Sequence, residues 1–127
     1  MIRLKRVYEP ATPEDGTRLL VERLWPREVK KTSLCLDAWV KQVAPSASLR
    51  RWFGHDQNKW DEFQLRYVAE LDKQVAAWEP ILKAAQNCAV PLIYSSHDTK
   101  HYNAVTLKEY LKAKLPKDAH QRSSSNA

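Results

Sequence analysis

The sequence predicts an α/β fold, in which a small, at least partly parallel sheet of about three strands is packed with helices. Two observations predict it. Short apolar or alternating segments typical of strands occur at 2–8, 18–25 and 89–95, and longer segments between them repeat apolar residues every three or four positions. Strands joined through helices favour parallel pairing. The chain has the length of one domain, expected at 1–115, followed by a polar tail at 116–127 that we expect to be flexible.

Each expected strand has its own signal. Residues 2–8 alternate apolar and basic side chains, which is typical of a strand with one buried face. Residues 18–25 give a second strand, which Pro26 should end because proline cannot continue a strand ladder. Residues 89–95 are short and apolar, as expected for a buried strand.

The helical segments are predicted from spacing and from capping residues. Thr32 and Ser33 are suited to cap a helix over about 34–43 that places Leu36, Trp39, Val40 and Val43 on one face. Pro45 and Ser46 should begin a short helical turn that Gly54 ends. A long amphipathic pattern runs from Trp60 to Ala85, and Pro80 should kink or restart it. A last helix is expected over 101–114.

The composition fits a globular protein, with 43% apolar and 28% charged residues. No segment approaches the length and apolarity of a membrane helix, and the N-terminus lacks a signal-peptide pattern, so we expect a cytoplasmic protein. Cys35 and Cys88 stand among apolar neighbours, and we expect them to be small core residues in a reducing compartment. The cluster Trp52, Phe53, Trp60 and Phe63 is also expected in the core, and a platform for stacking bases is the alternative.

Charge is concentrated in the first half of the chain. Residues 1–60 hold twelve Lys and Arg against seven Asp and Glu, within a net charge of +6 for the whole chain. This excess favours an anionic partner. The first hypothesis is a small anionic ligand, phosphate-containing or nucleotide-like, that binds at the carboxyl edge of the strands. A nucleic-acid-binding or regulatory module that uses Lys30, Lys31, Arg50 and Arg51 is the alternative, and general solubility would also account for the charge.

Ligands of such folds tend to bind beyond the carboxyl ends of the strands. There the sequence places Arg23 and Arg27 around Trp25, and Ser95 and Ser96 before Asn103. Arginine side chains bind phosphate or carboxylate in a fork and stack on aromatic rings. These six residues are the candidate ligand-binding set. The alternative is that the arginines pair with Glu22, Glu28 or Asp98 and only hold strand to helix.

Acid–base candidates are His55, Asp98 and His101. Histidine beside a carboxylate could act as a general base, and His55 precedes Asp56. Alternatively, this segment simply turns the chain, with Asp56 or Asn58 capping the long helix, and Asp98 is a helix cap. His97 and His101 have a helical metal spacing, but no fuller motif surrounds them, so we expect neither a metal nor a cofactor. GxSxG and Gly-rich phosphate loops are absent. Whether the protein is an enzyme stays open, with a hydrolase as a further alternative.

Three stretches of this sequence resemble the YeaO-like family, which is classed as domain of unknown function 488. They lie at 15–27, 44–71 and 92–104, and their most specific words are Arg23-Leu24-Trp25-Pro26-Arg27 and Trp52-Phe53-Gly54-His55-Asp56. The similarity covers roughly residues 1–112. It implies an α/β domain with a shared pocket built from the three stretches, and it implies no particular activity.

The chain departs from the family pattern at three positions. Glu22 stands where the family usually has Asp, Glu28 where it usually has Gly, and His97 where Lys or Arg is common. A glutamate after Arg27 should reshape that turn and partly neutralise an anion site. The loss of a fixed cation at position 97 weakens the site in the same direction.

Overall fold

Four parallel strands form the sheet in the computed structural model, which describes residues 1–95 and 102–115, except for the side chains of Lys31 and Ser33. The strand order is β1-β4-β2-β3. The α/β prediction with a parallel sheet is therefore confirmed, although the sheet has four strands where about three were expected. The strands are β1 (Ile2–Arg6), β2 (Leu19–Leu20), β3 (Ala38–Trp39) and β4 (Val90–Tyr94).

Strand β4 lies inside the sheet and pairs on both sides. Leu92 is opposite Leu4 of β1 and Leu19 of β2. Every residue of β4 is buried, as expected for a parallel strand that is covered on both faces. The apolar composition that predicted this strand is thus a direct result of its position. Because all strands are parallel, their carboxyl ends meet at one edge.

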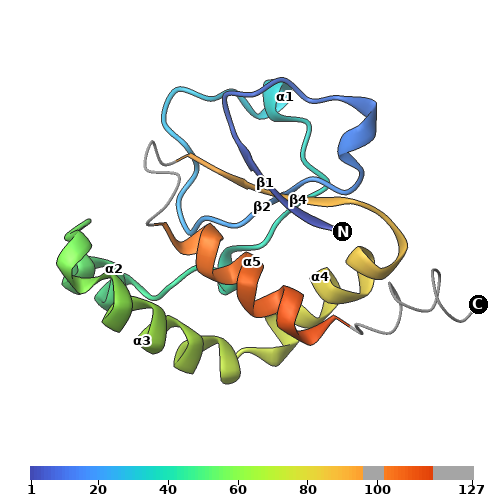
Figure 1. The fold of residues 1–127 in the computed structure, drawn as a ribbon. Coiled ribbons are helices and arrows are strands. Elements are labelled where there is room, and N and C mark those ends of the chain that lie inside the picture. The colour runs from blue at the N-terminus through green and yellow to red at the C-terminus, as the bar shows by residue number, and fades with distance from the viewer. Residues whose placement is uncertain (96–101, 116–127) are drawn as a thin grey trace, which may run out of the picture.

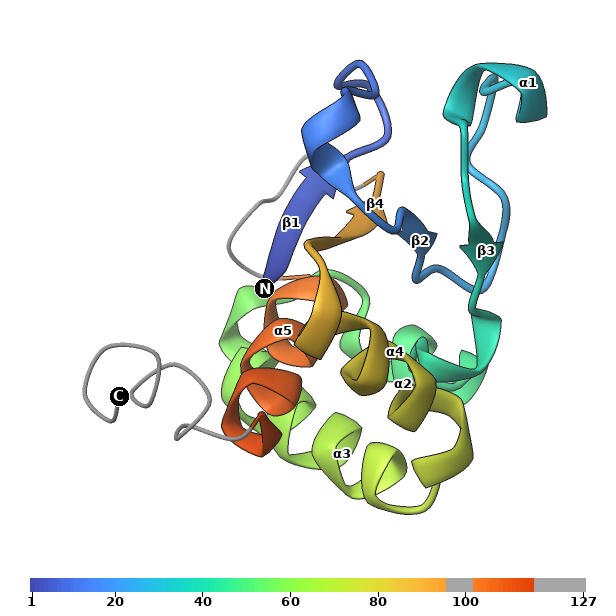
Figure 2. The same ribbon diagram turned by 90° about the vertical axis from the view of Figure 1, so that its right-hand side faces the viewer.

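Five α-helices accompany the sheet in the described residues (Figure 1). Helices α2 to α5 lie on one side of the sheet, and α1 lies on the other side together with the first 3-10 turn, as the two views agree (Figure 2). The helices are α1 (Lys31–Leu34), α2 (Ala47–Phe53), α3 (Trp60–Asp72), α4 (Val75–Asn87) and α5 (Asn103–Lys114), and the 3-10 turns are η1 (Pro13–Asp15), η2 (Lys41–Val43) and η3 (Gln57–Lys59).

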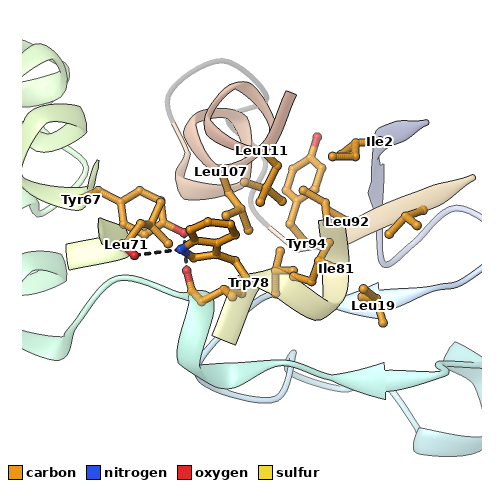
Figure 3. Packing of buried hydrophobic residues seen from close by; sticks show 14 of the residues in the cluster. Ile2, Leu19, Tyr67, Leu71, Trp78, Ile81, Leu92, Tyr94, Leu107 and Leu111 are labelled. Atoms are coloured by element: carbon orange, nitrogen blue, oxygen red, sulfur yellow. Dashed lines mark hydrogen bonds between the residues drawn. The ribbon is translucent and has the colours of Figure 1, made fainter. Parts of the chain in front are cut away.

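Side-chain alternation along the strands divides the apolar residues between two core clusters. Leu92 and Tyr94 of β4 enter the larger cluster, which packs against the long helices (Figure 3). Ile93, between them, enters the smaller cluster on the opposite face with Leu20 and Leu34. Neighbouring residues of a strand point to opposite faces, so one five-residue strand contributes to both clusters.

The prediction of a helix over 34–43 was wrong. Helix α1 ends at Leu34, because Cys35 adopts a left-handed backbone with φ 52°. The chain then pairs with β2: the Val40 amide donates to the Leu20 carbonyl at 2.8 Å. Leu36 and Trp39 pack in the smaller cluster, whereas Val40 and Val43 pack on the other side of the sheet. Strand pairing thus overrides a spacing that looked helical.

The break in the long amphipathic segment lies at Lys73 and Gln74, not at Pro80. The Leu71 carbonyl at the end of α3 accepts hydrogen bonds from the Gln74 amide and from the Trp78 indole, both at 2.9 Å. Pro80 instead lies within α4 and is exposed. Proline removes one helical hydrogen bond, and here the unmatched carbonyl belongs to Ala76, which is exposed and open to water.

Other segments differ in extent. The expected strand at 18–25 is regular only at Leu19–Leu20.

Both cysteines are exposed free thiols, so the prediction that they lie in the core was wrong. Helix α2 is capped by Ser46, whose hydroxyl accepts from the Leu49 amide at 3.2 Å, and it ends at Gly54 as expected. The predicted tail at 116–127 lies outside the described residues. No helix within the described ranges is long and apolar enough to cross a membrane.

Candidate functional site

Two adjoining cavities of about 690 and 230 Å³ open at the carboxyl edge of the sheet. Five described residues line both of them, so the two form one cleft, whose parts we call the larger arm and the smaller arm. Ligands of parallel α/β sheets usually bind at this edge. The shared residues are Pro45, Arg50, Ser95, Tyr102 and Asn103.

Glu22 lies at the floor of the smaller arm and is only 6% exposed. Its carboxylate accepts hydrogen bonds from the Ser95 amide at 3.0 Å, from the Ser95 hydroxyl at 2.8 Å and from the Tyr102 hydroxyl. Burial raises the pKa of Tyr102, and the Glu22 carboxylate raises it further, so Tyr102 stays protonated and donates. This arrangement joins the ends of β2 and β4 to the start of α5.

Arg23 holds the wall of the smaller arm. Its Nε donates to the Pro45 carbonyl at 3.1 Å, and its Nη2 donates to the Ala44 carbonyl at 2.9 Å. The alternative in which arginines only brace the fold therefore describes Arg23, although its partners are carbonyl groups. Neither Glu22 nor Glu28 pairs with it in the described part of the chain.

Trp25 and Arg27 both line the smaller arm. The Trp25 indole donates to the Val29 carbonyl at 2.6 Å, and its ring meets the Trp39 ring edge-on at 5.4 Å. Trp25 is therefore fixed in place. Arg27 is exposed, and no described residue gives its side chain a hydrogen bond or an ion pair. Its guanidinium group is available for an anion.

The larger arm has an aromatic floor and a basic rim. Phe53 and Phe63 line it, with ring centroids 4.5 Å apart. Arg50 and Arg51 come from the end of α2 and are exposed. Sequence reasoning assigned this pair only to a nucleic-acid surface. Their position directly before the motif Trp52-Phe53-Gly54-His55-Asp56 was the signal that could have placed them at the cleft.

His55 lines the larger arm but lacks the carboxylate expected beside it. Asp56 instead caps the next turn, where its Oδ1 accepts from the Asn58 amide at 3.0 Å. His55 itself has a left-handed backbone with φ 60° and is exposed. The reading of this segment as a capped turn thus accounts for Asp56, while the ring of His55 remains at the cleft.

Asn103 is the first residue of α5 and is 4% exposed. Its side-chain amide donates to the Val21 carbonyl at 3.3 Å, which fixes α5 against the end of β2. Behind it, Tyr67 donates to the Val43 carbonyl, and burial raises the pKa of Tyr67. Both side chains therefore hold the back of the cleft in place.

The fold brings most of the candidate residues to this one cleft. Ser96, Asp98 and His101, together with His97, lie outside the described residues. In the ranges that are described, no group of three His, Cys, Asp or Glu side chains is placed to hold a metal ion. The candidates that line the cleft are Arg23, Trp25, Arg27, His55, Ser95 and Asn103.

The chain is similar to a family model described as "Inactive DUF488-N3 subclade", which matches residues 1–127. It is 38% identical to uncharacterized protein YeaO of Escherichia coli strain K12, over 88% of this chain and 97% of that relative. It is 36% identical to uncharacterized protein Rv3073c of Mycobacterium tuberculosis strain H37Rv, over 82% of this chain and 88% of that relative. No solved structure matches the chain.

Proposed function

This chain belongs to the YeaO-like DUF488 family and matches its inactive N3 subclade throughout, and from that premise we propose that its cleft binds a small, phosphate-containing anion without converting it. The adjective in the subclade's description supports binding over catalysis. A cytoplasmic location accords with the proposal, because both cysteines are free thiols and a reducing compartment keeps thiols in that state.

The observation that carries the proposal is a set of three exposed arginines, Arg27, Arg50 and Arg51, around one cleft. No side chain in the described ranges forms a hydrogen bond or an ion pair with these three guanidinium groups. Guanidinium groups bind phosphate oxygens through paired N–H donors. An anion in the cleft would therefore accept charge-assisted hydrogen bonds from guanidinium groups that no described side chain occupies.

Glu22 does not cancel this positive charge at the ligand. It is the one carboxylate among the described residues that line the cleft. Its oxygens face the Ser95 and Tyr102 donors on the floor. An anion would bind away from Glu22, toward Arg27 and Arg50, because like charges repel at short distance.

The same contacts argue against a reaction in the cleft. A general base must be free to take a proton and must be oriented by its neighbours. Glu22 already accepts three donors, and Asp56 caps a turn instead of orienting His55. The described residues thus offer a site with strong positive charge and weak acid–base assistance.

Calorimetric titration of the purified protein with inorganic phosphate and ribose 5-phosphate tests the proposal. We expect binding that weakens at least tenfold in Arg50→Ala and in Arg27→Ala, because a hydrogen bond to a charged group contributes about 1.5–3 kcal/mol. Arg3→Ala is the matched control, since Arg3 is exposed on β1 and lies outside the cleft. All three variants should unfold at nearly the wild-type temperature.

Two results would contradict the proposal. One is the absence of any binding heat from millimolar phosphate or ribose 5-phosphate. The other is the same affinity in the cleft variants as in Arg3→Ala. If only oligonucleotides bind, with an affinity that falls steeply as salt is added, the nucleic-acid alternative replaces the proposed function.

A further inference from the structure

The two arms of the cleft differ in size and in chemistry. A cavity of about 690 Å³ lies within the range of roughly 300–1,000 Å³ that holds organic ligands, whereas one of about 230 Å³ lies below that range. A lone phosphate would leave most of the larger arm empty. The natural ligand should therefore carry more than an anionic group.

The wall of the larger arm contains several aromatic residues. Besides Phe53 and Phe63, it is lined by Tyr102, and the Phe63 ring is stacked on Trp60 at 5.4 Å with 16° between the ring planes. Phe53 also lies 6.2 Å from the exposed His55 ring. Phe53 and Phe63 are only 5% and 2% exposed, so they supply an apolar wall. The exposed His55 ring offers a face on which a planar ring of a ligand can stack.

Arg50 lines both arms and so lies at their junction. Arg27 borders the smaller arm alone, and Arg51 borders the larger arm alone. A ligand that spans the junction can place its negative charge beside Arg27 and Arg50 while its remainder lies over the aromatic floor. The arrangement thus sets an orientation as well as a composition.

We infer that the ligand is a planar, aromatic ring compound that carries a phosphate group on a short spacer, of which a nucleoside monophosphate is the simplest probe. The phosphate lies in the smaller arm between Arg27 and Arg50, and the ring lies in the larger arm against the His55 ring, beside the wall formed by Phe53 and Phe63. This inference rests on the proposed function, because it specifies which phosphate-containing anion the same cleft takes.

The first test compares probes on the wild-type protein by calorimetry. Adenosine 5'-monophosphate supplies ring and phosphate, ribose 5-phosphate supplies the phosphate and sugar, and adenosine supplies the ring and sugar. We expect the monophosphate to bind at least tenfold more tightly than either partial probe. Ribose 5-phosphate that binds as tightly as the monophosphate would overturn the placement of a ring, while the proposed function would stand.

The second test fills the larger arm. Ala47 is exposed on α2 and lines this arm, so Ala47→Phe should bring the affinity for the monophosphate down to that for ribose 5-phosphate and leave the latter unchanged. Ala69→Phe is the control, because Ala69 is exposed on α3 and borders none of the cleft. Unchanged monophosphate binding in folded Ala47→Phe would overturn the inference. Failure of all phosphate probes on the wild type would instead refute the proposed function itself. The probe comparison decides the question if Ala47→Phe does not fold.

Discussion

The Tyr102 hydroxyl donates to the Glu22 carboxylate across the carboxyl edge of the sheet. These residues are 80 positions apart in the sequence, and their contact ties the residue before α5 to the end of β2. The hydroxyl and carboxylate lie on the floor of the cleft, so the same bond contributes to stability and to the shape of the site.

Tyr102→Phe should lower the free energy of unfolding by about 1.5–3 kcal/mol, because it removes a donor from a buried, charged acceptor. Urea unfolding would measure the loss. Tyr110→Phe is the matched control, because the Tyr110 hydroxyl donates to Asp72 at an exposed position and should contribute less. Equal losses in the two variants would show that the hydrogen bond to Glu22 contributes no more stability than the exposed bond to Asp72.

Stability should fall in acid through Asp15. Lys5, bonded to the Asp15 carboxylate at 2.7 Å, is the main cause that holds the pKa of this carboxyl far below its usual range. A lowered pKa gives stability that is fully present above the unfolded value near 4 and is lost as pH falls toward the folded value. Between pH 5 and pH 2 the wild type should lose more stability than Asp15→Asn, which has no carboxyl group at this position. Urea titrations at several pH values would measure this difference, and parallel curves would contradict it.

Gly16→Ala should strongly destabilise the protein. A Cβ at this position would lie 2.2 Å from the Ala89 carbonyl oxygen, and the backbone φ of +78° disfavours any L side chain. We expect a loss of about 3 kcal/mol or more, since strain and a backbone clash add together. Gly54→Ala is the comparison, with φ +53° but its nearest atom at 3.7 Å, and it should cost only about 1 kcal/mol. Thermal unfolding that ranks the two in the opposite order would exclude the clash.

Glu28→Gly should stabilise the protein. Glu28 has a left-handed backbone with φ 60°, and the resemblance noted above puts glycine at this position. A non-glycine residue in this conformation costs roughly 1–2 kcal/mol, and the greater freedom of glycine in the unfolded chain offsets part of the gain. A net increase of about 0.5 kcal/mol is expected by urea unfolding. Glu28→Ala keeps the strain while removing the charge, so an equal gain in that variant would assign the effect to charge.

The sequence was most informative where local pattern and tertiary position agree. Strand β4 was predictable because a central parallel strand is apolar throughout, and α2 because Ser46 and Gly54 mark its two ends. Strand β3 was not predictable, because it forms by pairing with Leu20, a residue of a distant part of the sequence. Spacing alone could not show that Leu36 and Val40 would face opposite sides of the sheet.

The candidate site divides in the same way. The rule that ligands lie beyond the ends of parallel strands selected Arg23, Trp25 and Arg27, and they do line the cleft. The rule could not show that Arg23 would be used to hold two carbonyl groups while Arg50 remained free of partners in the described ranges. Those assignments depend on contacts between segments that the sequence does not bring together.

The position of β1 at the edge of the sheet has a consequence for biosynthesis. Within the described sheet β1 has β4 as its one neighbour, with Ile2 opposite Val90 and Arg6 opposite Tyr94. A ribosome makes the first strand long before its partner, at roughly 5–20 residues per second. The nascent chain therefore holds an unpaired strand for several seconds, and assembly of the cleft waits until most of the chain has left the ribosome.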